Sequence, residues 1–311
     1  MRAFIFPGQG AQTIGMGQAL AAQYPDAKAV FQEVDDALGQ ALSTLIWEGE
    51  IETLTLTANA QPALMATSLA AMKALQSEGL SITDAGFVAG HSLGEYAALA
   101  AAGSISIADT ARLLRIRGDA MQAAVPAGQG AMAAILGLDI EAVAAVAEAA
   151  AQGDVCEVAN ENDPAQTVVS GDKNAVERAV DLAKEAGAKR AVMLPVSAPF
   201  HCSLMSPAAT RMQEALAAVD ITVPAVPLVA NVTAQSVSDP NEIRDLLVKQ
   251  VTGRVRWRAS VDWMAAQGVT EMWEIGSGKA LSGMIRRINR DVATRNIGTP
   301  DDVNAVMNST E

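Results

Sequence analysis

The sequence predicts an α/β protein in which helices cover both faces of a mostly parallel sheet and a small βαββαβ unit is inserted. Short apolar segments suited to buried strands alternate with long helical stretches. Half of the 311 residues are hydrophobic but only 4% are aromatic, which favours closely packed helices on a sheet over a β-sandwich. In the middle of the chain, predicted strands and helices become shorter and alternate more regularly, which indicates a second structural unit.

Four segments fit buried strands of the large sheet. The first is AFIF at residues 3–6, an apolar run that ends at a Pro-Gly pair. The second, GFVAG at 86–90, is followed at once by a segment with helical spacing, HSLGEYAALAAAG. The remaining two are PLVAN at 227–231 and TEMWEIG at 270–276. Strands separated in this way by helices are typical of parallel sheets.

The inserted unit reads as strand, helix, strand, strand, helix, strand from residue 131 to residue 196. This is the order of a ferredoxin-like subdomain. A linker-like stretch, PAGQG at 126–130, precedes it, and prolines at 195 and 199 close it. We therefore predict a large subdomain at 1–125 and 199–311 and a small ferredoxin-like subdomain at 126–198.

Composition limits the classes of partner and the cellular location that we expect for this protein. The net charge of −13 argues against a nucleic acid partner, because neutralising phosphates requires a basic surface. No run of eighteen uncharged apolar residues and no signal peptide is apparent, so we expect a cytoplasmic protein with no membrane partner. Cys156 and Cys202 have no metal-binding spacing, so we expect two reduced thiols and no metal site.

The charge is uneven along the chain. Residues 244–295 contain ten Lys and Arg but five Asp and Glu, a local net charge of +5. A basic region on an acidic protein suits an acidic partner or ligand. Ordinary scatter of surface charge is the alternative explanation.

The motif GHSLG at residues 90–94 lies between a predicted strand and a predicted helix, which is the context of a nucleophile elbow. Its two glycines relieve crowding at a sharp turn. Ser92 then stands at the apex, beside backbone N–H groups of a helix N-terminus that can stabilise an oxyanion. A glycine-rich turn with a capping serine is the alternative. We predict that Ser92 is a nucleophile.

A serine hydroxyl needs a base to accept its proton, and the chain has two histidines. His91 directly precedes Ser92, and successive side chains diverge at a sharp turn. His201 ends the segment SAPFH, in a loop after a predicted strand, where catalytic groups are common. We therefore predict that His201 is the base, with a structural histidine as the alternative. Many acidic residues surround the pair, so none is singled out as a third member.

One arginine of the predicted helix after residue 106 is placed unusually. Arg112 and Arg115 lie on its charged side, whereas Arg117 is four residues from both Leu113 and Met121, on the apolar stripe. A buried guanidinium must find an anion, because leaving it unpaired is costly. The anion can be a protein carboxylate or a substrate carboxylate. The planar guanidinium of arginine is well suited to bidentate recognition of either.

Seven segments, taken in combination, carry a family resemblance. They are FPGQGAQTIGMG (6–17), NAQPAL (59–64), GHSLGEYAAL (90–99), RLLRIRG (112–118), AGAKRAVMLPVS (186–197), SAPFH (197–201) and EIGSGKAL (274–281). Together they resemble the malonyl-CoA:acyl carrier protein transacylase family of bacterial type II fatty acid synthesis, nearly from end to end, whereas GxSxG alone would indicate only a hydrolase-like protein. The last segment carries Ser277 where proline is frequent in the family.

The resemblance implies the catalytic roles and the large subdomain's hydrolase-like fold. Ser92 would be the nucleophile and His201 its base. The His201 ring would be oriented by a main-chain carbonyl near Gln250 in place of an acidic residue. Gln9 and Leu93 would donate backbone N–H groups to the oxyanion.

The resemblance also implies a substrate pocket. Arg117 would hold the malonyl carboxylate, and Gln61 matches a glutamine that lines the family's pocket. Asn160 and Asn162 match small-subdomain positions near the active site. Phe200 resembles members that select malonyl over methylmalonyl groups.

The implied reaction is ping-pong transfer of malonyl from malonyl-CoA to the phosphopantetheine thiol of acyl carrier protein, with no metal or cofactor and by a monomer. An acyltransferase of polyketide synthesis or of malonate decarboxylase would use the same chemistry. A serine thioesterase or esterase with the same elbow is a rival interpretation, and a non-catalytic carrier-binding module is another. For the acidic carrier, the candidate contacts are Lys189, Arg190, Arg286, Arg287 and Arg290.

Overall fold

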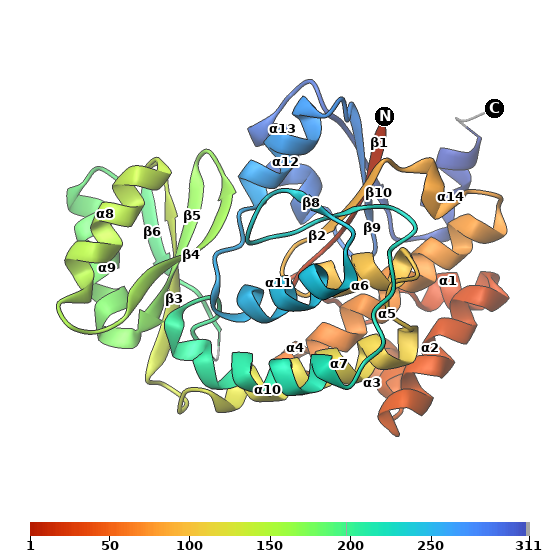
Figure 1. The fold of residues 1–311 in the computed structure, drawn as a ribbon, viewed down its shortest axis with the longest axis horizontal. Helices are drawn as coiled ribbons and strands as arrows, with labels where there is room; N and C mark the ends of the chain where they lie inside the picture. Colours follow the sequence, from red (N-terminus) through yellow and green to blue (C-terminus); the bar gives the residue numbers. More distant parts are fainter. Residues whose placement is uncertain (197, 309–311) are drawn as a thin grey trace.

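Two sheets organise the computed structural model, which describes residues 1–196 and 198–308 (Figure 1). The larger sheet is parallel apart from one antiparallel edge strand, as the sequence predicts. In spatial order its strands are β10 (Ala293–Ile297), β9 (Glu271–Ile275), β1 (Arg2–Phe6), β2 (Phe87–Gly90), β7 (Leu228–Val229) and β8 (Ser236–Val237).

Helices cover both faces of this sheet because its central strands are apolar on both sides. On β1, Phe4 and Phe6 enter the core beneath α5, whereas Ala3 and Ile5 enter a second core with α12 and α13. The helices of this subdomain are α1 (Gln18–Gln23), α2 (Pro25–Leu38), α3 (Leu42–Glu48), α4 (Ile51–Thr55), α5 (Thr57–Ser77), α6 (Gly94–Ala101), α7 (Ile107–Ala123), α10 (Ser206–Ala217), α11 (Pro240–Thr252), α12 (Trp257–Ala266), α13 (Ala280–Ile288) and α14 (Pro300–Met307), with 3₁₀ turns η1 (Ile82–Asp84) and η2 (Ser203–Met205).

Among the described residues, no helix has both the length and the apolar content to cross a bilayer.

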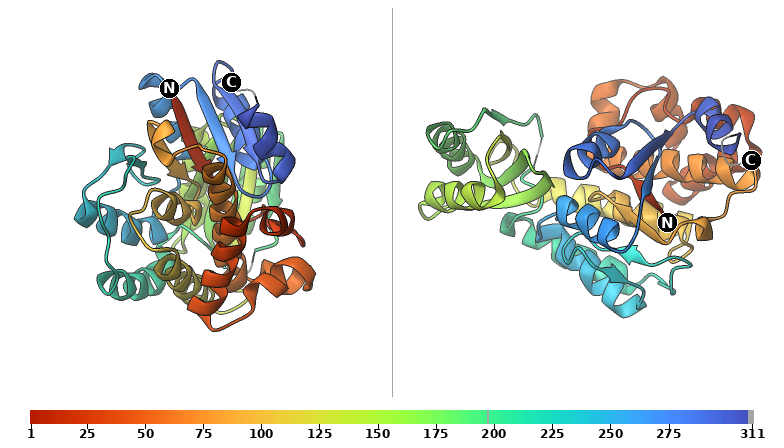
Figure 2. Two further views of the ribbon diagram at one scale, coloured as in Figure 1. Left: turned by 90° about the vertical axis from the view of Figure 1, so that its right-hand side faces the viewer. Right: turned by 90° about the horizontal axis from the view of Figure 1, so that it is seen from above.

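The smaller sheet is antiparallel and stands to one side of the large subdomain (Figure 2). Its βαββαβ order and its strand order are those of a ferredoxin-like unit, so the predicted fold class is confirmed. The predicted boundaries at 126 and 198 stay predictions, and Ser197 lies outside the described residues. In spatial order the strands are β4 (Cys156–Asp163), β5 (Gln166–Asp172), β3 (Gly130–Leu136) and β6 (Arg190–Met193), packed with α8 (Ile140–Ala151) and α9 (Lys173–Glu185).

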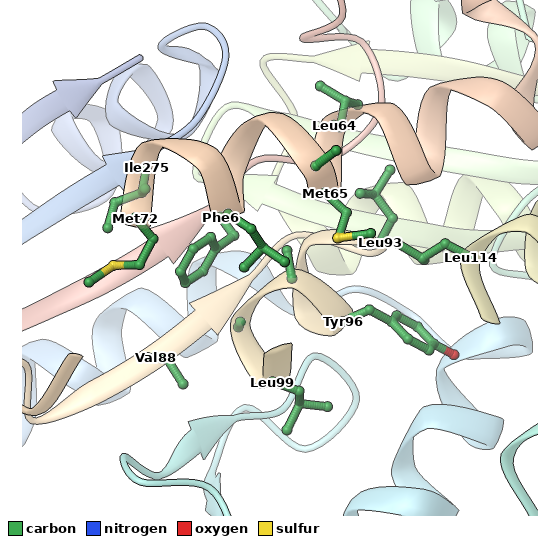
Figure 3. Packing of buried hydrophobic residues seen from close by; sticks show 14 of the residues in the cluster. Phe6, Leu64, Met65, Met72, Val88, Leu93, Tyr96, Leu99, Leu114 and Ile275 are labelled. Atoms are coloured by element: carbon green, nitrogen blue, oxygen red, sulfur yellow. The ribbon is translucent and has the colours of Figure 1, made fainter. Parts of the chain in front are cut away.

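Helix α6 is fixed in place because it is packed between the large sheet and α5. Its residues Tyr96 and Leu99 belong to the same buried apolar cluster as Phe6 of β1, Val88 of β2 and Met65 of α5 (Figure 3). A Cβ on Gly94 would lie 2.2 Å from the carbonyl oxygen of Phe6, so only glycine lets α6 approach β1 this closely. The turn that enters α6 is therefore held rigidly against the sheet.

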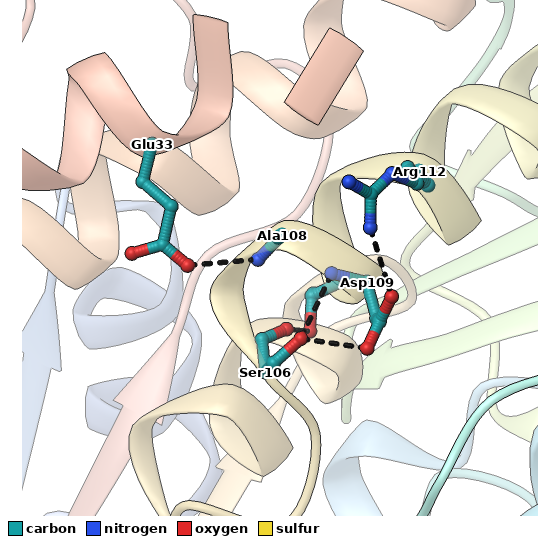
Figure 4. A network of polar contacts seen from close by, with 6 residues as sticks. Glu33, Ser106, Ala108, Asp109 and Arg112 are labelled. Carbon is teal, nitrogen blue, oxygen red and sulfur yellow. Dashed lines mark hydrogen bonds and ion pairs between the residues drawn. The ribbon is translucent and has the colours of Figure 1, made fainter. Parts of the chain in front are cut away.

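Helix α7 is held at its start by polar contacts and along its length by close packing. The Ser106 hydroxyl caps it by accepting from the Asp109 N–H, and Glu33 of α2 accepts from the Ala108 N–H (Figure 4). Further along, a Cβ on Gly118 would lie 2.6 Å from the Cα of Ala58, so glycine lets α7 lie directly against α5. This contact brings the neighbouring Arg117 within reach of α5.

The structure departs from the sequence prediction at two edges of the large sheet. The segment 227–231 forms a ladder only at Leu228–Val229, because Ala230 donates its N–H to Gln235 in a turn that leads to β8. Strand β10 was not predicted, since ATRNI is mostly polar and half-exposed at the edge of the sheet.

Candidate active site

Ser92 stands at the turn between β2 and α6 in a left-handed conformation, with φ of 55°. This region is unfavourable for a residue with a side chain, so the surroundings must hold it. Asn231, two residues after β7, does so: its Oδ1 accepts from the Ser92 N–H at 2.8 Å, and its Nδ2 donates to the Gly90 carbonyl at 2.7 Å. The turn that follows the neighbouring parallel strand thus bonds the elbow on both sides of His91.

The structure brings Ser92 and His201 together, with 2.7 Å between Oγ and Nε2. The other ring nitrogen, Nδ1, lies 2.9 Å from the Gln250 carbonyl and 3.1 Å from the Gly253 carbonyl. Carbonyl oxygens only accept, so Nδ1 carries the hydrogen and Nε2 has a free lone pair that faces the serine hydroxyl. Two main-chain carbonyls thus orient the ring.

His201 is held in its neutral form. Burial, followed by the nearby Arg117 charge, lowers the pKa of His201 to about 3, although the bonds to the two carbonyls act in the opposite direction. The imidazole is therefore an available proton acceptor throughout the neutral pH range.

Arg117 on α7 is 1% exposed and points at the same serine. Its Nη2 donates to Ser92 Oγ at 3.1 Å and to Gln250 Oε1 at 2.9 Å, and its Nη1 donates to Gln61 Oε1 at 2.8 Å. Its Cζ lies 5.7 Å from the centre of the Tyr96 ring. Within the described chain the guanidinium forms no ion pair, so its hydrogen-bond partners are all neutral.

Gln250 connects these groups. Its main-chain carbonyl orients His201, and its side-chain Oε1 accepts from Arg117. Its Nε2 donates to the Ser92 carbonyl at 2.8 Å and to Glu95 Oε2 at 2.7 Å. One buried residue of α11 therefore contacts the nucleophile, the base and the cation.

Gln9 and Leu93 lie beside the elbow. A Cβ on Gly8 would lie 2.7 Å from the His91 carbonyl, so the loop carrying Gln9 packs directly on the turn. The Gln9 side chain reaches Thr57 at 3.3 Å. Within the described residues, neither the Gln9 nor the Leu93 backbone N–H has an acceptor, so both remain available to an incoming oxygen.

The remaining predicted residues lie further from the serine hydroxyl. Asn162 Oδ1 bonds His91 Nε2 at 2.9 Å, which turns His91 away from Ser92 as the sequence suggested. Asn160 pairs through its backbone with Val255, and Phe200 packs into the main core next to His201. Among the described residues, no group of three or more His, Cys, Asp or Glu side chains is arranged to hold a metal ion.

Sequence reasoning missed two residues of this network, Asn231 and Glu95. For each residue, the sequence contains a pattern that could have indicated its role. Asn231 is the polar residue that ends the apolar segment PLVAN, where the carboxyl end of a parallel strand commonly carries functional groups. Glu95 is the single charged residue of α6, and a charge in a wholly apolar helix requires a partner.

The arrangement supplies a hydroxyl nucleophile, a neutral base, two backbone donors and a buried cation. A hydroxyl activated in this way can attack an ester or thioester carbonyl, while the two N–H groups stabilise the oxyanion. The cation lies within hydrogen-bond reach of the nucleophile, so it suits an acyl group that carries a carboxylate of its own.

Comparison with known proteins agrees with this chemistry. Residues 3–287 match the family model described as acyl transferase domain. Malonyl CoA-acyl carrier protein transacylase of Bacillus subtilis is 47% identical, over 97% of this chain and 94% of the relative, and that of Escherichia coli K12 is 46% identical over 98% of each.

Solved structures give the same result. An acyl-carrier-protein-S-malonyltransferase from Bartonella henselae has a TM-score of 0.97 at 55% identity, covering 99% of this chain and 98% of the other. A malonyl-transacylase in complex with a type II PKS acyl-carrier protein has a TM-score of 0.96 at 40% identity, covering 99% of each chain.

The neutral state of His201 should be visible in stability measurements. The folded protein takes up this proton near pH 3, whereas the unfolded chain does so near 6.5. Between these values the unfolded state binds more protons, so stability falls as the pH decreases. From about pH 7 to about pH 5, we expect the free energy of unfolding to fall by about 2 kcal/mol more in the unsubstituted protein than in His201→Gln. Urea denaturation measures both, and equal falls would contradict the assignment.

Proposed function

The chain belongs to the acyl transferase domain family, and from that premise we propose that it transfers malonyl groups from malonyl-CoA to an acyl carrier protein through a malonyl-Ser92 intermediate. The Ser92–His201 pair supports the covalent step, and Arg117 supports the choice of malonyl. The names of the relatives support both the donor and the acceptor. The product would supply malonyl units to fatty acid biosynthesis.

In the first half-reaction, the Ser92 oxygen attacks the thioester carbonyl while His201 Nε2 takes the hydroxyl proton. The carbonyl oxygen becomes negatively charged and lies between the N–H groups of Gln9 and Leu93. When the tetrahedral intermediate collapses, the carbon–sulfur bond breaks and His201 returns the proton to the departing coenzyme A thiol. Malonyl-Ser92 remains.

The second half-reaction runs the same steps in the opposite direction. The phosphopantetheine thiol of the carrier gives its proton to His201 and attacks the ester carbonyl. The carbon–oxygen bond breaks, and Ser92 regains the proton from His201. No metal or redox cofactor takes part in this scheme, and each residue named in it has a partner in the same site. We propose that the protein acts as a monomer.

The observation that carries the malonyl assignment is the buried guanidinium of Arg117. Its partners are two amides and the nucleophile's hydroxyl, and its charge has no directly bonded carboxylate in the described chain. Burying a cation in this way is costly unless an anion arrives. A malonyl group on Ser92 places a carboxylate a few bonds from the ester, where Nη2 already reaches. Of the two anions that the sequence allowed, the substrate carboxylate is thus favoured.

A thioesterase or esterase is the rival with the same elbow. The two differ in what discharges the acyl-serine, since a transferase must exclude water while admitting a thiol. Transfer to a polyketide carrier is a second possibility for the acceptor, and one relative was solved with such a carrier. The chemistry on Ser92 is common to all of them.

The carrier-docking residues proposed from sequence do not form one patch. Lys189 and Arg190 lie at β6, one edge of the small sheet, whereas α13 packs against β4 at the other edge, about 14 Å away across three strand spacings. On α13, Arg287 pairs with the buried Asp163 at 2.8 Å. Of the two groups, the exposed Arg286 and Arg290 lie on and just after α13, beside β4, whose Asn162 bonds His91 next to the nucleophile. We therefore choose these two cations as the candidates for meeting an acidic carrier.

Intact-mass measurement tests the intermediate. After malonyl-CoA is added, we expect the protein to gain the mass of one malonyl group and Ser92→Ala to gain none. Adding holo carrier protein should remove the adduct at least about tenfold faster than buffer does, since the site is built for a thiol acceptor. Equally fast loss in buffer would indicate a hydrolase, and an adduct on Ser92→Ala would place the nucleophile elsewhere.

Replacing Arg117 tests the substrate choice. In Arg117→Ala the malonyl carboxylate loses its partner while an acetyl group loses nothing comparable. We expect kcat/KM for malonyl-CoA to fall on the order of 100-fold more than that for acetyl-CoA. Stopped-flow acylation with both thioesters measures the ratio, and equal losses would defeat the assignment.

Charge reversal tests the docking surface. We expect the double substitution Arg286→Glu with Arg290→Glu to raise the KM for carrier about tenfold at low salt and to leave acylation by malonyl-CoA unchanged. The control reverses Lys28 and Lys73, two exposed lysines on α2 and α5, which changes the net charge equally. Similar effects from both pairs, or a parallel loss of acylation, would contradict a role in docking.

A further inference from the structure

Glu95 is a buried acid beside the site to which the mechanism above gives no role. It is 0% exposed on the first turn of α6. Its Oε2 accepts from Gln250 Nε2 at 2.7 Å and from the Asn231 N–H at 3.3 Å. Its Oε1 is buried and has no hydrogen-bond partner within the described residues. A carboxylate with half of its hydrogen-bonding capacity unused is costly to bury, so its charge needs another source of stabilisation.

The side-chain amide of Gln250 connects Glu95 to Arg117. The amide nitrogen donates to the Glu95 carboxylate, and the amide oxygen accepts from Arg117 Nη2. This polarity fixes the orientation of the amide, because the reverse orientation would set donor against donor at Arg117. Glu95 is therefore a counter-charge that is linked to Arg117 through one amide, without a direct ion pair.

Few other ionisable groups act on Glu95. Arg117 approaches from α7, Tyr96 adjoins it on α6, and His201 is held neutral in the neighbouring loop. Strands β2 and β7 carry no ionisable side chains, and the one on β1, Arg2, pairs with Glu271. From α5 and α11 the neighbours are the neutral amides of Gln61 and Gln250.

The balance of these effects leaves the Glu95 carboxyl group about half ionised at neutral pH. Burial raises the pKa of Glu95 to about 7, against the hydrogen bonds from Gln250 and Asn231 and the positive charge of Arg117. A second anion at Arg117 would neutralise the charge that favours the ionised form and add repulsion, so it would push Glu95 toward protonation.

We propose that Glu95 is a positioning residue that supplies the resting counter-charge of Arg117 through Gln250, and that it takes up one proton from solvent when a malonyl carboxylate binds the guanidinium directly. This rests on the proposed malonyl transfer. The loaded site then holds one cation, one substrate anion and a neutral acid. By linkage, malonyl loading weakens as the pH rises through about 7, because ionised Glu95 competes for Arg117.

The test counts protons taken up per malonyl-serine formed. At about pH 7.5 roughly three-quarters of Glu95 is ionised, so we expect uptake of about half a proton or more per adduct. An indicator dye in weak buffer measures the protons, and intact mass measures the adduct. Glu95→Gln keeps an acceptor for Gln250 and Asn231 but has no charge, and its uptake should be close to zero.

Two controls isolate Glu95. Glu33→Gln removes a carboxylate that contacts the first turn of α7, the helix of Arg117, and should take up as many protons as the unsubstituted protein. Loading the unsubstituted protein with acetyl-CoA brings no carboxylate and should cause no uptake. This second control also subtracts any proton released by the coenzyme A thiol, and it holds even if Glu95→Gln folds poorly.

The outcomes separate this proposal from the proposed function. If no malonyl adduct forms, malonyl transfer itself is wrong. If the adduct forms without proton uptake, or with equal uptake in Glu95→Gln, the role of Glu95 is wrong. The KM for malonyl-CoA gives a further readout: it should rise several-fold from about pH 6.5 to 8.5 in the unsubstituted protein and stay nearly constant in Glu95→Gln. A merely structural role would change kcat or KM by the same factor at every pH.

Discussion

The central constraint on this molecule is the buried charge of Arg117. A guanidinium that is 1% exposed and directly bonded only to neutral partners must be held by the fold, since its counter-charge Glu95 reaches it only through the amide of Gln250. The fold holds it through Gly118, which lets α7 lie against α5, and through the amides of Gln61 and Gln250. Burying the charge lowers the stability of the empty site, and only a substrate that carries a carboxylate compensates for it, so the same charge makes the site specific for such a substrate.

The same charge sets the protonation of the catalytic base. Arg117 lowers the pKa of His201, and two main-chain carbonyls fix its tautomer without introducing a negative charge. An acidic third member next to the imidazole would have raised the pKa and offered the guanidinium a permanent partner. The two carbonyls raise the pKa of His201 less than a carboxylate would, so the ring stays neutral with Nε2 free to accept a proton, and no acid beside the imidazole competes with substrate for Arg117. The absence of an acid beside His201 and the absence of a directly bonded carboxylate at Arg117 therefore have the same electrostatic consequence, a neutral base next to a cation that can accept a substrate carboxylate.

The sequence predicted the parts of this site that depend on local pattern. The elbow at Ser92 follows from two glycines between a strand and a helix, and the unusual position of Arg117 follows from helical spacing. Family resemblance supplied Gln250, Gln61 and the oxyanion donors, which local pattern does not reveal. The roles of Asn231 and Glu95 were not predicted because they arise from contacts between residues 136 to 155 positions apart in the sequence. Strand β10 escaped for a similar reason, since its pairing with β9 outweighs a polar, half-exposed sequence.

The small subdomain supports the active site through its edge strand β4, although none of its described residues bonds the nucleophile's hydroxyl. Asn162 bonds the ring of His91, the neighbour of Ser92, and Glu157 accepts from the N–H and hydroxyl of Ser203, two residues after His201. Between Glu157 and Asn162, strand β4 forms two backbone hydrogen bonds with Val255: the Ala159 carbonyl accepts from the Val255 N–H, and the Glu161 N–H donates to the Val255 carbonyl. Val255 lies two residues beyond Gly253, whose carbonyl orients the imidazole. One strand thus supports the nucleophile, the base and the base's orienting loop from outside. Because Ser92 and His201 both have positive φ, neither position is stable on local grounds, and this shared support from a second sheet keeps their 2.7 Å contact in place.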